Sequence, residues 1–167
     1  TNAALDASLV IPCFCRPEMV EEGLGWLMRQ THPHDRFEVL LVDDSGPENY
    51  HLTRTVFERA RVDFPLRYFT TGLPKEVYGV TVARNIGMRE AQSPLVAYTD
   101  DDCFCHPAFI AEHVASHREI DRLMLTGYRG MRMKDLRDLN LVTKNFEFET
   151  EITIEALRNN MRIMEFP

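Results

Sequence analysis

Two short apolar runs place the strongest constraint on how this chain can fold. Residues 8–14 (SLVIPCF) and 37–43 (FEVLLVD) are almost continuously apolar, without the alternation of polar and apolar side chains that a half-exposed strand shows. Such runs are typical of strands that helices cover on both faces. Between them, Pro17 precedes Val20 and Leu24 at helical spacing, which predicts the order strand, helix, strand.

The alternation of strands and helices continues along the rest of the chain. The sequence predicts helices at residues 49–61, 81–91, 107–117 and 148–159, and strands at residues 66–69, 95–99, 123–128 and 162–166. This order predicts one α/β domain of Rossmann type, with a mainly parallel sheet and helices on both faces. In such a sheet, ligands bind beyond the carboxyl ends of the strands.

Two helix faces carry more specific expectations. In the last predicted helix, Ile152, Ala156 and Leu157 are expected to face the core. His113 and His117 lie four residues apart, a spacing that can bind a metal, but no Glu follows His113 as it does in zinc proteases. We therefore expect the two histidines on a partly exposed helix face.

The composition indicates the class of protein. A length of 167 residues, with 44% hydrophobic and 27% charged side chains, fits one globular domain. The formal net charge of -7 argues against a nucleic-acid partner, because duplex binding depends on clustered Lys and Arg. The first residues, TNAALDAS, lack the basic and apolar segments of a signal peptide, so we expect a cytoplasmic protein.

The four cysteines form two Cys-Phe-Cys strings, at residues 13–15 and 103–105. Neither the chain length nor this spacing is that of a disulfide-rich secreted protein, so we expect free thiols. Because both strings follow strands that are neighbours in the predicted sheet, a site of four sulfurs is the alternative. Structural zinc ligands, however, are usually spaced by two to four residues.

Carboxylates follow two strands of the predicted sheet. Residues 43–44 come after the second strand, and three consecutive acids occupy residues 100–102 after the strand at 95–99. Three adjacent acids repel one another unless a cation offsets their charge, and oxygen ligands with phosphates suit Mg²⁺ or Mn²⁺. Two alternatives remain. The acids at 100–102 also fit a helix N-terminus near Pro107, and those at 43–44 fit an ordinary turn.

Four motifs, taken together, resemble those of family 2 glycosyltransferases. They are SLVIPCF at residues 8–14, FEVLLVDDSG at 37–46, VARNIG at 82–87 and LVAYTDDDCFCHPAFIAEH at 95–113. Agreement of four motifs in order and spacing is far more specific than an isolated Asp-x-Asp triplet. The resemblance implies a GT-A fold, a nucleotide-sugar donor, a divalent metal and inversion at the anomeric carbon of the transferred sugar.

The resemblance also assigns residues to the donor. It places Pro12 and Phe14 beside the base and ribose, gives Asp43 or Asp44 a hydrogen bond to the base, and puts Arg84 near the donor. Phe14 also fits a core position, and the segment around Arg84 also fits a surface helix that packs closely through a glycine.

In the acidic run, the resemblance makes Asp102 the first choice for a direct metal ligand. Asp100 is the second metal candidate, or meets the ribose or a metal-bound water, and Asp101 is grouped with the donor-binding residues. By this assignment, Mg²⁺ or Mn²⁺ would offset the charge that grows on the leaving diphosphate.

The strings FEFETEI (146–152) and MRIMEFP (161–167) resemble the closing helix and strand of the same family. The resemblance aligns Glu149 with the general base and puts Glu151 close behind it. Family members usually have aspartate at the base position, and the extra methylene of glutamate changes the reach of the carboxylate. Glu149 also fits a helix N-terminus, where the dipole favours an acid.

The same tail resembles glycosyltransferases that act on polyprenyl phosphate, which implies peripheral association with the inner face of the cell membrane. A phosphate nucleophile needs little help from a base, so Glu149 would then matter less than Arg129 or Arg132. The acceptor is therefore a glycan hydroxyl or a lipid phosphate. On family grounds, a UDP-sugar is favoured over a GDP-sugar as the donor.

The domain is expected to divide into two functional parts. Residues 1–118 form the nucleotide-sugar-binding half, and residues 119–167 form a short or truncated acceptor half. Few residues separate the strand near 126–128 from the closing helix, where family members usually carry a longer acceptor-binding stretch. The alternative to an enzyme is therefore a non-catalytic or truncated nucleotide-sugar-binding module.

Overall fold

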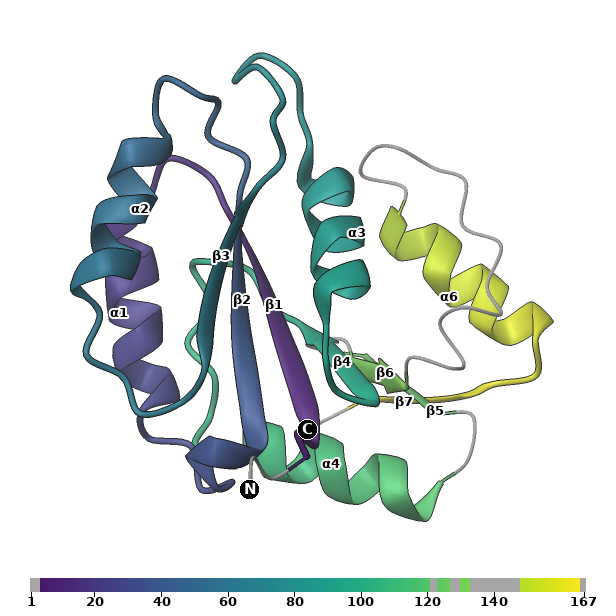
Figure 1. Ribbon diagram of the computed structural model, residues 1–167. Coiled ribbons are helices and arrows are strands. Elements are labelled where there is room, and N and C mark those ends of the chain that lie inside the picture. The colour runs from purple at the N-terminus through teal and green to yellow at the C-terminus, as the bar shows by residue number, and fades with distance from the viewer. Residues whose placement is uncertain (1–3, 121–122, 127–129, 133–147, 166–167) are drawn as a thin grey trace.

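One sheet of seven strands organises the part of the chain that the computed structural model describes, residues 4–120, 123–126, 130–132 and 148–165 (Figure 1). Side chains are described for residues 4–120 and 153–163. The strands are β1 (Ala7–Cys13), β2 (Phe37–Asp43), β3 (Leu66–Thr70), β4 (Leu95–Tyr98), β5 (Leu123–Thr126), β6 (Gly130–Arg132) and β7 (Arg162–Glu165). Their order across the sheet is β3-β2-β1-β4-β6-β5-β7.

Helices cover both faces of this sheet, as predicted (Figure 1). They are α1 (Pro17–Leu27), α2 (Tyr50–Arg59), α3 (Val80–Glu90), α4 (Phe109–Glu119) and α6 (Phe148–Arg158), with a 3-10 turn η1 (His34–Arg36) before β2. Helices α1, α2 and α4 pack on one face and α3 on the other. In the described part of the chain, no helix combines the length and the apolar composition that crossing a membrane requires.

The sheet is mainly parallel, which confirms the prediction. Strands β3, β2, β1 and β4 run parallel to one another, whereas β6 runs antiparallel to both β4 and β5, and β7 runs parallel to β5. The sequence did not predict β6. Its three residues are too few to show a hydrophobic period, and its direction is set by pairing with strands elsewhere in the chain.

The register of β1 brings three strand ends to one edge of the sheet. Strand β1 pairs with β2 from Ala7–Phe37 to Cys13–Asp43, and its Val10 pairs with Tyr98 of β4. Because these strands are parallel, the segments that follow them leave the sheet on the same side. The polar residues after each strand therefore converge.

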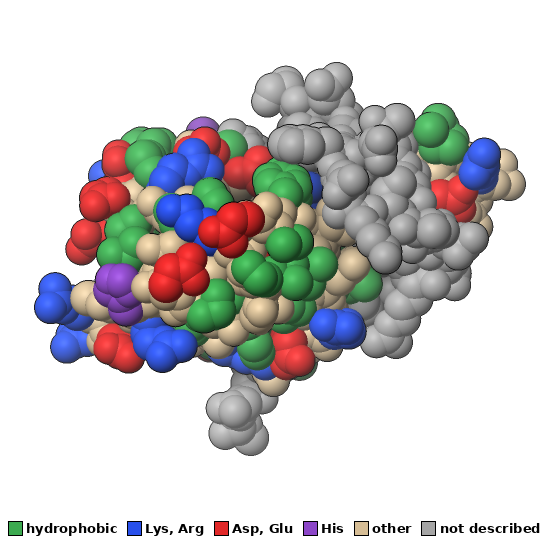
Figure 2. Space-filling model, turned by 90° about the horizontal axis from the view of Figure 1, so that it is seen from above, with side chains coloured by type: hydrophobic (Ala, Val, Ile, Leu, Met, Phe, Trp, Pro, Cys, Tyr) green, Lys and Arg blue, Asp and Glu red, His purple; other side chains and the backbone are tan. Residues whose placement is uncertain are grey.

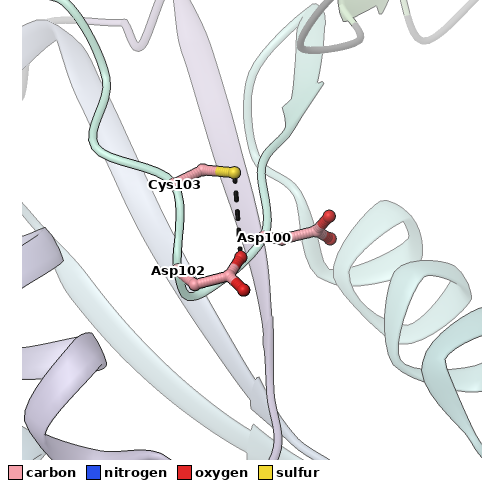
Figure 3. Close-up of side chains that lie close together, drawn as sticks. All are labelled: Asp100, Asp102 and Cys103. Carbon is pink, nitrogen blue, oxygen red and sulfur yellow. Dashed lines mark hydrogen bonds between the residues drawn. The ribbon is translucent and has the colours of Figure 1, made fainter.

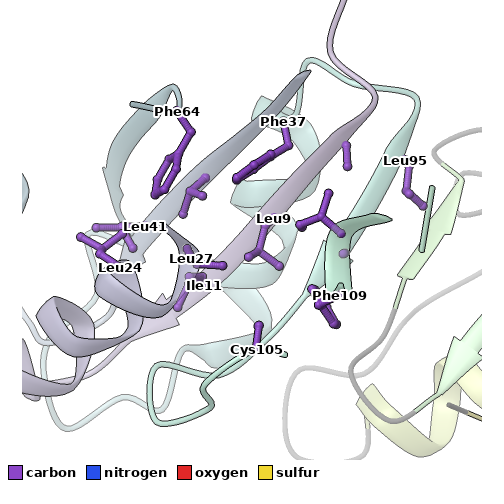
Figure 4. Close-up of a cluster of buried hydrophobic side chains, with 14 of the residues drawn as sticks. Leu9, Ile11, Leu24, Leu27, Phe37, Leu41, Phe64, Leu95, Cys105 and Phe109 are labelled. Carbon is purple, nitrogen blue, oxygen red and sulfur yellow. The ribbon is translucent and has the colours of Figure 1, made fainter. Parts of the chain in front are cut away.

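Alternate residues of β1 pack into two different layers. Leu9 and Ile11 point into the larger cluster with α1 and α4 (Figure 4), whereas Val10 packs with Val42 and Ala83 on the α3 side. Leu9 and Val10 are fully buried, and full burial of such a side chain stabilises the fold by about 1.5–3 kcal/mol. Burial on both faces explains why the sequence of β1 shows no polar and apolar alternation.

Helix α3 approaches β1 through Gly87. A Cβ on Gly87 would overlap both Cγ atoms of Val10, whose side chain is fully buried in β1. Only a residue without a side chain allows this approach, because a packed core has little free volume to absorb a methyl group. The close contact positions the first turn of α3 at the edge where the strands end.

Replacement of Gly87 by Ala is expected to lower the free energy of unfolding by about 1–3 kcal/mol, because the added methyl group must displace Val10. Gly25→Ala in α1 is the matched control, since a Cβ there meets nothing within 4 Å. Removing this helix glycine should raise stability by up to about 1 kcal/mol. Urea denaturation checks both values, and a stabilised Gly87→Ala variant would show that the helix does not pack as described.

Two helix faces differ from what the sequence indicated. His113 and His117 are 0% and 5% exposed, because this side of α4 packs toward the core, where the ring of Phe109 lies 4.5 Å from that of His113. Ala156 is fully buried as expected, but Leu157 is 59% exposed, and the side chain of Ile152 lies outside the described residues. Neighbouring helical residues point roughly 100° apart, so burying one of this pair turns the other toward solvent.

Candidate functional site

A pocket of about 380 Å³ lies at the edge where β1, β2 and β4 end. Ligand pockets commonly hold about 300–1,000 Å³. Its described lining residues are Pro12, Cys13, Phe14, Arg16, Asp44, Tyr78, Val80, Arg84, Asp100, Asp101 and Asp102. Figure 2 views the molecule from this side, where acidic, basic and hydrophobic side chains lie close together. The pocket thus brings together most of the residues that the sequence singled out.

Asp43, at the end of β2, holds the turn that follows the strand. Its carboxylate is fully buried and accepts hydrogen bonds from the Ser45 backbone N–H (2.9 Å) and the Tyr68 hydroxyl (2.8 Å). The turn then passes through Gly46, whose φ of 85° lies in the left-handed region that favours glycine. Asp43 is not among the described residues that line the pocket, so its contacts join β2 to β3 instead.

Asp44 lines the pocket and fixes the loop that leads to α3. Its carboxylate accepts hydrogen bonds from the Thr71 hydroxyl (2.7 Å) and the Gly79 backbone N–H (2.8 Å). Burial raises the pKa of Asp44 above its ordinary value, although these two hydrogen bonds act in the opposite direction. Of the two acids after β2, Asp44 is therefore the one among the described pocket-lining residues.

Asp101 is the buried member of the acidic run. Its side chain is 2% exposed, and the carboxylate accepts hydrogen bonds from the Phe14 backbone N–H (3.1 Å) and the Arg16 guanidinium (2.5 Å). Burial raises the pKa of Asp101, with the N–H of Phe14 and the charge of Arg16 opposing that shift. Asp101 thereby ties the end of β1 to the loop after β4.

The other two acids are exposed, and an arginine contacts each of them. Asp102 is paired with Arg16 at 2.7 Å, and Asp100 with Arg84 at 3.2 Å. The side chains of Asp100 and Asp102 are 52% and 47% exposed. Backbone geometry after β4 thus buries the central acid and turns its two neighbours toward the pocket.

Asp100, Asp102 and Cys103 form a group that fits a divalent ion. One ligand atom of each lies within 4.8 Å of the others, and the Cys103 thiol points to the carboxylate of Asp102 (Figure 3). Two carboxylates with open positions suit Mg²⁺ or Mn²⁺, which are usually held by few protein ligands together with phosphates. All four cysteines are free thiols, as expected, and the described metal-compatible group contains one of them.

The acidic run does not cap the following helix, which was the alternative explanation for it. Helix α4 begins at Phe109, its N-cap is Ala108, and no side chain makes a capping hydrogen bond there. The carboxylates of residues 100–102 instead contact Arg16, Arg84 and the backbone of Phe14.

Two exposed aromatic residues lie on the pocket wall. Phe14 is 40% and Tyr78 46% exposed, so Phe14 does not occupy the core position that was its alternative. Exposed rings at a pocket offer surfaces on which a planar ligand can stack. Tyr78 and Arg16 were not predicted from the sequence. The signals available for them were an aromatic residue before Gly79 and a cation three residues after the first strand.

The C-terminal residues singled out by the sequence lie mostly outside the described side chains. The backbone of Glu149 and Glu151 belongs to α6, and that of Arg132 to β6, but their side chains are outside the described residues. Arg129 is also outside them. Their roles stay predictions.

Cys15, two residues after the end of β1, has a backbone φ of 52°, in the left-handed region. Its backbone N–H donates a hydrogen bond to the Ser45 hydroxyl (2.7 Å), which holds this conformation. Asn adopts such angles more readily than other side chains, whereas β-branched residues rarely do.

Cys15→Asn is therefore expected to raise the free energy of unfolding by up to about 1 kcal/mol, and Cys15→Thr to lower it by about 1 kcal/mol or more. Urea denaturation under reducing conditions measures both changes. Shifts of the same sign in the two variants would mean that backbone strain at this position does not govern the effect.

The sequence is similar to those of known glycosyltransferases. Residues 8–164 match the family model described as Glycosyl transferase family 2. Validoxylamine A glucosyltransferase from Streptomyces hygroscopicus subsp. limoneus is 32% identical over 111 residues, which cover 66% of this chain and 23% of that protein. The poly(ribitol-phosphate) beta-N-acetylglucosaminyltransferase TarS from Staphylococcus aureus is 25% identical over 130 residues, covering 74% of this chain and 21% of TarS. The chain thus spans only about a fifth to a quarter of the length of these relatives.

Solved structures share the fold. TarS from S. aureus in complex with UDP-GlcNAc has a TM-score of 0.73 at 19% identity, covering 97% of this chain and 56% of that one. The mannosyltransferase PcManGT from Pyrobaculum calidifontis, in complex with GDP-Man and Mn²⁺, has a TM-score of 0.75 at 18% identity, covering 99% and 55%. These neighbours are GT-A glycosyltransferases, so the predicted GT-A-like fold is confirmed.

Proposed function

The chain belongs to glycosyl transferase family 2. On that premise we propose that its pocket binds a nucleoside diphosphate sugar and that the protein transfers the sugar to an acceptor. The observation that carries this proposal is the pocket itself. It joins exposed aromatic rings, the carboxylate of Asp44, the cation of Arg84 and the acids of residues 100–102 in one space of about 380 Å³. A nucleoside diphosphate presents the matching groups: a planar base, a polar ribose and charged phosphates.

The base and ribose would lie against Pro12, Phe14 and Asp44. A ring can stack on Phe14, and the carboxylate of Asp44 can accept a hydrogen bond from a base N–H. We favour a UDP-sugar over a GDP-sugar because of the resemblance to family 2 glycosyltransferases. TarS with UDP-GlcNAc and PcManGT with GDP-Man provide structural neighbours for each choice.

The donor's diphosphate would lie at the exposed acids together with Mg²⁺ or Mn²⁺. Asp102 is the first proposed ligand and Asp100 the second, and their exposed carboxylates fit a hard divalent ion. When bound, the ion supplies positive charge that offsets the negative charge on the leaving diphosphate. Asp101 holds the loop that carries both ligands, and Arg84 steadies Asp100.

Glu149 is the proposed general base, with Glu151 as the second candidate. Inverting transfer requires a carboxylate within hydrogen-bond reach of the acceptor hydroxyl, opposite the departing diphosphate. Both residues belong to α6, which precedes β7. If the acceptor is instead a polyprenyl phosphate, the nucleophile is already ionised and the contribution of Glu149 is small. The lipid acceptor would place the protein at the inner face of the cell membrane.

A nucleotide-sugar-binding module without turnover is the second candidate. The chain spans 23% of the validoxylamine relative and 56% of the TarS chain in the UDP-GlcNAc complex, so turnover is part of the proposal rather than of the comparison. The donor pocket is present within the described residues in either case. Binding therefore tests the donor site, and turnover distinguishes an enzyme from a module.

Titration of UDP and GDP, each with Mn²⁺ and with chelator, is expected to show binding of UDP that depends on the metal. Asp102→Ala should abolish the metal-dependent part of this binding, because the variant lacks the first proposed ligand. Asp35→Asn, at an exposed acid in η1, is the control for loss of one negative charge. Unchanged metal-dependent affinity in Asp102→Ala would remove Asp102 from the metal site.

Glu149→Gln is expected to reduce the rate of UDP release from the donor by about 100-fold or more, because glutamine has the shape of glutamate but cannot act as a general base. The affinity for UDP should not change. Glu151→Gln, two residues along the same helix, is the matched comparison and should have the smaller effect. Release of UDP is measured with a glycan acceptor and with a polyprenyl phosphate. Full activity of Glu149→Gln toward a glycan acceptor would exclude it as the base.

A further inference from the structure

Arg16 contacts Asp102, the first proposed metal ligand, directly through its guanidinium. Its NH1 donates to Asp102 at 2.7 Å, and its NH2 donates to Asp101 at 2.5 Å. The side chain is 47% exposed and lines the pocket. We propose that Arg16 competes with the divalent ion for Asp102 and that, when the ion binds, its side chain turns to hold the donor's diphosphate. This inference rests on the proposed function of the pocket as a donor site.

Competition follows from the shared carboxylate. Asp102 accepts a hydrogen bond from Arg16 on Oδ2, whereas its other oxygen, Oδ1, lies beside the Cys103 thiol. A divalent ion at Asp100 and Asp102 would stand close to the guanidinium, and like charges at such distances repel. Metal binding therefore weakens the bond between Arg16 and Asp102, and that bond in turn weakens metal binding.

The second contact of Arg16 makes this movement a local one. Asp101 is buried and keeps one carboxylate oxygen on the Phe14 backbone N–H, so its other oxygen stays in place to hold NH2 of Arg16. Release of NH1 from Asp102 thus leaves the guanidinium anchored at one end. Because Arg16 lies just before Pro17, at the start of α1, the movement involves the side chain alone.

The excess of negative charge in the pocket favours a further cation that can bind the diphosphate. Asp100, Asp101 and Asp102 face the two cations Arg16 and Arg84, so carboxylates outnumber guanidiniums where the diphosphate would lie. A planar guanidinium donates paired hydrogen bonds to phosphate oxygens, a geometry that lysine does not reproduce. An ion on Asp102 frees NH1 of Arg16 to donate hydrogen bonds to phosphate oxygens, while NH2 stays on Asp101.

Arg16→Gln separates the two roles, because they predict changes of opposite sign. Mn²⁺ titrated alone should bind about five-fold tighter to the variant, since the competing cation is gone. UDP titrated at saturating Mn²⁺ should bind about ten-fold weaker, since a charged hydrogen bond to phosphate is lost. Free Mn²⁺ is followed by electron paramagnetic resonance and UDP by calorimetry.

Arg89→Gln is the matched control, because Arg89 is an exposed arginine in the last turn of α3 and lines none of the described pocket. It changes the net charge equally and should alter neither affinity. Arg16→Lys keeps the charge without the fork, so both affinities should change in the same directions by less. This variant carries the comparison if thermal melting shows that Arg16→Gln does not fold.

Unchanged or weaker Mn²⁺ binding in Arg16→Gln would overturn the competition. Unchanged UDP affinity would overturn the role at the diphosphate. If the wild-type protein binds Mn²⁺ but neither UDP nor GDP, the proposed donor function fails, together with the diphosphate role. The comparison of Mn²⁺ alone still decides whether Arg16 competes for Asp102.

Discussion

The parallel register of β1 with β2 and β4 is the constraint on which the rest of this structure depends. Pairing from Ala7–Phe37 to Cys13–Asp43, together with the pairing of Val10 with Tyr98, brings three chain segments out at one edge of the sheet. Buried apolar side chains on both faces fix that register, because a shift by one residue would exchange the two faces. The pocket is a consequence of this alignment and of the close approach of α3 at Gly87.

Acids at this edge divide into those that hold the pocket and those available to a ligand. Asp43 and Asp101 are buried and take their hydrogen bonds from backbone N–H groups and from neighbouring side chains. Asp100 and Asp102 are exposed and are paired with arginines. Burial penalises a charged carboxylate that lacks donors, so the buried acids need fixed partners. In the proposed function, the exposed acids exchange an arginine for a metal ion.

Much of the fold and of the candidate site was predictable, because the signals were local. The apolar runs at 8–14 and 37–43 predicted β1 and β2 within one residue of their observed bounds. The sequence did not distinguish Asp43 from Asp44, since their difference lies in contacts with Tyr68 and the loop before α3. It also missed β6, whose three residues are too few for a period and whose pairing is non-local.

The sequence by itself determined the alternation of strands and helices, the family, and the presence of carboxylates after two strands. These depend on the order and spacing of residues, which the chain carries directly. Only the tertiary structure decided that Asp101 is buried while its neighbours face the pocket, and that Arg16 reaches across from the end of β1 to two of these acids. Such choices arise where segments about 85 residues apart meet, and no local pattern encodes the geometry of that meeting.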